Sequence, residues 1–77
     1  MPSPSRKADP ALGPVLKRLR TERGLSQEAL AYQAGLTSGS LARIELGQAS
    51  PEWSTVRRIA KALDVSLVDL AARVERE

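Results

Sequence analysis

The chain has 77 residues with no cysteine and no histidine, and 12 lysines and arginines against 9 acidic residues give it a net charge of +3. This length fits one small domain and leaves no room for a second domain that holds a cofactor, while the missing cysteines and histidines exclude disulfides and zinc sites as stabilisers. We therefore expect a thin core stabilised by helix packing or self-association, no cofactor and no metal, and a modest preference for an anionic partner.

The apolar runs argue against a membrane-bound or exported protein. None approaches the roughly 18 residues that a membrane span requires, and the N-terminus lacks the hydrophobic stretch of a signal peptide. We expect a soluble protein of the cytoplasm.

The N-terminal segment differs in composition from the rest of the chain. Residues 1–9, MPSPSRKAD, are rich in proline and serine and nearly free of apolar side chains, and such a composition does not support a packed core. We predict a flexible arm over residues 1–9 and a single domain over residues 10–77.

Apolar spacing predicts short helices throughout the domain. In the first, Leu12, Val15, Leu16 and Leu19 follow the i, i+3, i+4, i+7 pattern of one buried helix face. The later helices begin at hydroxyl or acidic caps, and glycines end the first three. The expected start signals are Asp9 with Pro10, Ser26, Thr37, Ser50 with Pro51 and Glu52, and Ser66, and the expected end signals are Gly24, Gly35 and Gly47.

The last two helices complete the predicted core. The segment VSLVDL could be read as a strand, but Ser66 and Asp69 have the spacing of a capping box, and the apolar spacing continues beyond them. We therefore expect an all-α fold, a compact bundle of five helices. The expected core face of the fourth helix is Trp53, Val56, Ile59, Ala60 and Leu63, and the apolar positions of the fifth include Leu67, Val68, Leu70, Ala71 and Val74.

The second and third helices have the spacing of a helix-turn-helix. Ala31 is a small residue where the two backbones would approach most closely, and Gly35 falls in the turn. Leu41 and Ile44 follow where the second helix must pack on the first. Each residue is common alone, but the set at this spacing is a fairly specific signal.

The outer face of the third helix is unusually bare. Opposite Leu41 and Ile44 the sequence places mostly small side chains and one long cation, Arg43. A helix that lies in a major groove ~12 Å wide must present small or hydrogen-bonding side chains, and an arginine can bind guanine O6 and N7. The residues of this outer face are Gly39, Ala42, Arg43 and Leu46.

The stretch GLSQEALAYQAGLTSGSLARIELGQASP, residues 24–51, resembles the Cro/CI-type (XRE-like) helix-turn-helix DNA-binding domains of phage repressors and bacterial regulators. The following RIAKALDVSLVDL is similar to the fourth and fifth helices of that family. In size the chain also resembles the controller proteins of restriction-modification systems. The resemblance implies a lambda-repressor-like bundle that binds double-stranded DNA, with residues 37–46 as the recognition helix.

The resemblance also implies roles for single residues. Ser38, Gly39 and Arg43 match positions that face bases, whereas Gln27 and Gln48 match positions that bind backbone phosphates, which position the protein but do not read sequence. Many relatives carry a larger polar residue at Gly39, so readout here would rest on few side chains. The complete expected DNA-binding set is Gln27, Thr37, Ser38, Gly39, Ser40, Ala42, Arg43 and Gln48.

Two further features concern support and assembly. By the resemblance, Arg20 and Glu45 form a partly buried ion pair that joins the first helix to the recognition helix. The fifth helix is more apolar than packing on a thin core requires, so we favour a homodimer, which would present two recognition helices to half-sites ~34 Å apart, over completion of the monomer core alone. The expected dimer interface is Trp53, Leu67, Leu70, Ala71 and Val74.

Two groups of cations have open roles. Arg6 and Lys7 in the arm either follow a DNA groove or make no contact. Arg57, Arg58 and Lys61 lie opposite the core face of the fourth helix and are better explained as a solvated surface than as a DNA contact.

Our main interpretation is a nucleoid-associated transcriptional regulator that binds a palindromic operator as a homodimer. The alternative is an antitoxin or adaptor that uses the same fold mainly to hold a protein partner. An enzyme is set aside, because without histidine or cysteine, and with serines at helix caps and on the outer face, no nucleophile is paired with a base.

Overall fold

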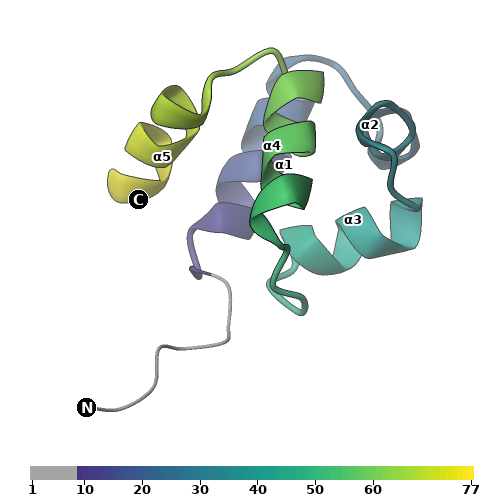
Figure 1. Ribbon diagram of the computed structural model, residues 1–77, viewed down its shortest axis with the longest axis horizontal. Helices are drawn as coiled ribbons and strands as arrows, with labels where there is room; N and C mark the ends of the chain where they lie inside the picture. The colour runs from purple at the N-terminus through teal and green to yellow at the C-terminus, as the bar shows by residue number, and fades with distance from the viewer. Residues whose placement is uncertain (1–8) are drawn as a thin grey trace.

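The computed structural model describes residues 9–77, which fold into five α-helices with no strand among them. Figure 1 shows α2 and α3 on one side of α1 and α4, and α5 on the other. The predicted five-helix, all-α fold is confirmed, whereas the predicted arm, except for Asp9, lies outside the described residues. The helices are α1 (Leu12–Glu22), α2 (Gln27–Ala34), α3 (Ser38–Glu45), α4 (Trp53–Ala62) and α5 (Leu67–Glu75).

Three of the predicted N-caps are confirmed by their hydrogen bonds. Ser26 Oγ accepts from the Ala29 backbone N–H, and Ser66 Oγ from that of Asp69, each at 3.0 Å. Thr37 Oγ1 caps α3 in the same way, through the Ser40 N–H at 3.0 Å. Each cap satisfies one of the N–H groups that a helix start leaves without an intrahelical acceptor.

The predicted start of α1 is wrong by about two residues, whereas α4 starts within its predicted residues. Asp9 Oδ1 accepts from the Ala11 N–H at 2.8 Å and Asp9 O from the Leu12 N–H at 3.0 Å. These bonds form a turn that contains Pro10, so α1 begins only after it, with Ala11 as its N-cap. In α4, the N-cap is Glu52 in extended conformation, the last of the three residues expected at that start.

The turn between α2 and α3 depends on Gly35. Its φ of +72° lies in the left-handed region, which L-residues with a side chain adopt only at a cost. The Leu36 N–H then bonds to Ala31 O at 2.8 Å, which closes a Schellman motif and turns the chain sharply into α3. The turn therefore fixes the angle at which α3 leaves α2.

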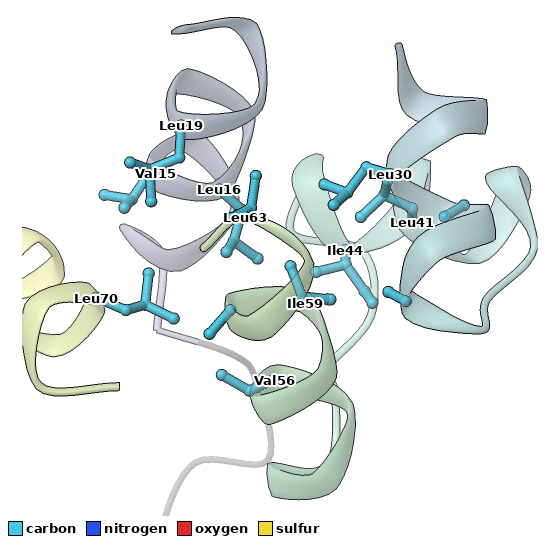
Figure 2. Packing of buried hydrophobic residues seen from close by; sticks show 13 residues of the cluster. Val15, Leu16, Leu19, Leu30, Leu41, Ile44, Val56, Ile59, Leu63 and Leu70 are labelled. Carbon is cyan, nitrogen blue, oxygen red and sulfur yellow. The ribbon is translucent and has the colours of Figure 1, made fainter. Parts of the chain in front are cut away.

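The core gathers side chains from all five helices (Figure 2). α2 packs against α3 and α4, and α5 against α1 and α4. Trp53, expected on the core face of α4, is instead 66% exposed. Side chains lean toward the N-terminus of their helix, so the first residue of α4 extends beyond the helix start rather than into the core. The buried apolar residues are Val15, Leu16, Leu19, Leu30, Ala31, Ala34, Leu41, Ile44, Val56, Ile59, Ala60, Leu63 and Leu70.

Candidate nucleic-acid interface

The structure leaves the outer face of α3 open to solvent. Leu41, Ile44 and Glu45 are buried on its inner side. On the opposite side Leu46 is 70% exposed although it is apolar. Ser38, Gly39 and Arg43 are also exposed, while Ser40 and Ala42 are half-buried.

Gly39 is not required by packing. A Cβ atom built at this position has no other atom within 4 Å, apart from its own chain neighbours and the local helix backbone. Glycine within a helix costs about 1 kcal/mol relative to alanine. Packing within residues 9–77 therefore does not account for the glycine at this position.

The hydroxyl groups at the start of α3 are partly committed to the helix itself. Thr37 Oγ1 accepts from the Ser40 N–H and lies 2.9 Å from Ser40 Oγ, to which it donates. Thr37 and Ser40 therefore stabilise the helix start before any ligand arrives. Ser38 and Arg43, by contrast, are exposed, and Arg43 takes part in none of the ion pairs within residues 9–77.

One buried carboxylate connects three helices behind this face. Arg20 Nε of α1 donates to Glu45 Oε2 at 2.7 Å, and Arg20 Nη2 to Glu45 Oε1 at 3.1 Å. Arg20 and Glu45 are only 8% and 6% exposed. Gln27 Nε2 of α2 donates to the same Glu45 Oε1 at 2.9 Å, and Arg20 Nη1 to Leu25 O at 2.8 Å. The orientation of α3 is thus fixed by charge-assisted bonds from both preceding helices.

Gln27 therefore has a more constrained role than the sequence indicates. One hydrogen of its amide is used by Glu45, which leaves one for a phosphate. The backbone N–H groups of Gln27 and Glu28, in the first turn of α2, have no acceptor within the helix. Gln48, the other expected phosphate contact, is exposed in the loop after α3, where its backbone N–H bonds to Arg43 O at 2.8 Å.

Sequence reasoning missed Gly13, which determines how closely α1 approaches α3. A Cβ on Gly13 would lie 2.7 Å from the backbone oxygen of Ile44, and nearer still to that of Glu45. Only glycine permits this contact between the start of α1 and the end of α3. A glycine inside an amphipathic helix pattern was the available signal.

The five residues expected at a dimer interface line one groove between α1, α4 and α5. Trp53 and Ala71 are exposed in it, and Leu67 and Val74 are half-buried. Leu70, however, is only 3% exposed and belongs to the core of the single chain. Leu70 thus has little surface left for a partner.

The described residues contain no group of three histidine, cysteine, aspartate or glutamate side chains that could hold a metal ion. Within the same residues, no helix is both long and apolar enough to cross a membrane.

Comparison with known proteins finds the helix-turn-helix domain family over residues 11–73. An uncharacterised HTH-type transcriptional regulator, y4dJ of Sinorhizobium fredii, is 37% identical over 59 residues, which are 77% of each chain. The HTH-type transcriptional regulator PuuR of Escherichia coli is 33% identical over 66 residues, 86% of this chain but only 36% of PuuR.

Solved structures show the same architecture. The restriction-modification controller protein C.AhdI from Aeromonas hydrophila superposes with a TM-score of 0.78 at 35% identity, over 80% of this chain and 94% of that one. The controller protein C.Esp1396I gives a TM-score of 0.83 at 28% identity, over 88% and 87% of the two chains. The clp gene regulator ClgR from Corynebacterium glutamicum, at 24% identity, shares the fold, with a TM-score of 0.85 over 97% of this chain and 78% of that one.

Proposed function

The chain belongs to the helix-turn-helix family of transcriptional regulators, and from this premise we propose that it binds one or a few palindromic operators as a homodimer and regulates transcription in the cytoplasm. The exposed outer face of α3 is the observation that carries the proposal. It combines an exposed arginine with two exposed small residues, one of which is a glycine that packing does not require.

The exposed groups of α3 and the two glutamines beside it have distinct proposed tasks. Arg43 donates two hydrogen bonds to guanine O6 and N7, and Ala42 contacts a thymine methyl. Ser38 and Gly39 let the helix backbone approach the base edges. Gln27, with the free N–H groups at the start of α2, binds a backbone phosphate, and Gln48 binds another.

The groove of α1, α4 and α5 supports the homodimer. Trp53 and Ala71 expose apolar surface there, and burying such surface against a second copy is favourable. A two-fold dimer places two copies of α3 on half-sites about 34 Å apart, one helical turn of DNA.

The first experiment is the selection of genomic fragments bound by the purified protein near ~0.15 M salt, where purely electrostatic binding is weak. Recovery of a palindromic site supports the proposal. Recovery of nothing above background contradicts it and favours the alternative, an antitoxin or adaptor that mainly binds a protein.

The recovered operator then tests base readout by Arg43. Arg43→Ala should weaken operator binding by about 1–3 kcal/mol per half-site, because both hydrogen bonds to guanine are lost, while binding to scrambled duplex changes little. Titrations of both duplexes measure the two affinities. Arg57→Ala, which removes an exposed arginine from α4, is the matched control and should leave their ratio unchanged. Equal losses on the two duplexes would refute base readout by Arg43.

A further inference from the structure

The contact between α1 and α3 has one buried flank and one open flank. Gly13 and Arg20 lie on the contact line, since Gly13 meets the backbone at the end of α3 and Arg20 binds Glu45. At 100° per residue, Leu16 lies to one side of this line and Lys17 to the other. Leu16 is buried in the core and Lys17 is exposed, so Lys17 lies on the open flank.

The outer face of α3 lies on that same open flank. Around the axis of α3, the Ile44 side chain is rotated from that of Glu45 toward the core. The side chains of Ala42 and Leu46 are rotated from Glu45 in the opposite direction, away from the core. Ile44 is buried, and Leu46 is largely exposed. Lys17 and the outer face of α3 are therefore on the same side of the α1–α3 contact.

Within residues 9–77, Lys17 has no anionic partner, unlike its neighbour Arg18. Arg18 donates to Glu77 at 2.8 and 3.3 Å, and this hydrogen bonding holds the pKa of the Glu77 carboxyl below its usual value. Among the ion pairs within residues 9–77, none involves Lys17. The charge of Lys17 is thus available to an external anion.

We propose that Lys17 binds a phosphate of the DNA backbone at the edge of the major groove that receives α3, an assignment that rests on the proposed function. An α-helix is about 10–12 Å across and fills a groove ~12 Å wide. A second helix packed on the end of the recognition helix therefore lies over the wall of the groove, which is the sugar-phosphate backbone. Lys17 is the α1 cation on the flank that faces this wall.

The test is the salt dependence of operator binding by Lys17→Gln, with Lys61→Gln as the matched control. Lys61 is an exposed lysine near the end of α4. Loss of one phosphate contact in each half-site should reduce the slope of log affinity against log salt by about 0.9 per half-site, about 1.8 for the dimer, and weaken binding about five-fold per half-site at ~0.15 M salt. The preference for operator over scrambled duplex should not change, because phosphates carry no sequence information. Lys61→Gln should leave the slope as it is.

A second measurement locates the contact on the DNA. When single phosphates of the operator are replaced by neutral methylphosphonates, at least one replacement that weakens the original protein should have no effect on Lys17→Gln. Without such a position, or with an unchanged slope for Lys17→Gln, the assignment is overturned. The proposed function would still stand if Arg43→Ala no longer preferred the operator over scrambled duplex. If no operator is recovered, the slope of log affinity against log salt is measured on random-sequence duplex for the original protein and Lys17→Gln. This comparison still tests the phosphate contact, because all sequences share the same backbone.

Discussion

At the end of α4, Asp64 adopts the left-handed backbone conformation that glycine adopts at the ends of α1, α2 and α3. Its φ is +58°, and those of Gly24, Gly35 and Gly47 lie between +67° and +76°. All four residues follow a helix and precede the N–H that closes a Schellman motif. A residue with a Cβ is disfavoured in this region, so the backbone of Asp64 is strained. Other interactions at the end of α4 must offset the cost of this conformation.

At position 64 we expect Asp64→Gly to be more stable than Asp64→Ala by about 1 kcal/mol. Both substitutions remove the same charge, so the difference reports only the backbone conformation. Urea unfolding of the two variants measures it. Arg57, exposed in the interior of α4, is the matched control: there Arg57→Ala should be the more stable of the pair by a similar amount. If the same variant, glycine or alanine, were the more stable at both positions 64 and 57, the explanation by backbone conformation would be contradicted.

Sequence reasoning succeeded at residues whose partners are local. The caps Ser26, Thr37 and Ser66 bond to N–H groups three residues ahead, so their spacing was visible in the chain. Trp53 was misplaced because its exposure depends on where α4 begins and on what lies beyond that point, and neither is encoded in apolar periodicity.

At the scale of elements, the crossing of α1 and α3 depends on contacts that sequence periodicity does not reveal. The bare outer face of α3 was predictable, because the residues that form it are close in sequence. The close contact of Gly13 and the proposed role of Lys17 were not predictable, because both depend on α1 meeting the end of α3, which comes only after α2 in the chain.

The substitution Gly13→Ala tests this crossing. Its Cβ would meet the backbone of Ile44 and Glu45, so the helices must separate. Overpacking typically costs about 1–3 kcal/mol, against which the better helix propensity of alanine returns less than about 1 kcal/mol. We expect a lower free energy of unfolding and, because α3 is displaced, weaker operator binding.

Gly39→Ala provides the comparison, because its Cβ enters open space. This variant should gain up to about 1 kcal/mol in the free energy of unfolding. Thermal and urea unfolding of the two variants decide the matter, and a stabilised Gly13→Ala protein would contradict the close crossing.

At the scale of the whole molecule, the groove of α1, α4 and α5 determines how a dimer can be tested. Leu70→Glu, the obvious substitution in the apolar stripe of α5, would bury a charge in the core of each chain, since Leu70 is 3% exposed. The loss of a dimer would then be indistinguishable from unfolding. An exposed residue of the groove is needed instead.

Ala71→Glu meets this requirement, because Ala71 is exposed and lines the groove. Two-fold symmetry brings the new carboxylates and the nearby Glu75 of both copies into one apolar interface, where unpaired charge is unfavourable. Analytical ultracentrifugation should show a change from dimer to monomer, with the helical circular dichroism preserved and operator affinity reduced.

Val68→Glu is the matched control, because Val68 is 77% exposed on the same helix but does not line the groove. It should sediment like the original protein. A dimer that persists in Ala71→Glu would place the interface on another surface.

The open space around Gly39 also has a consequence for divergence among related regulators. Ser38, Gly39 and Arg43 are exposed, while the orientation of α3 is maintained by the buried Arg20, Gln27 and Glu45 network behind it. Substitutions at the outer positions can therefore accumulate without disturbing the fold. On the proposed base readout by this face, copies of such a gene within one genome would acquire different operators through changes at a few positions, and each copy would keep a stable fold from the first substitution onward.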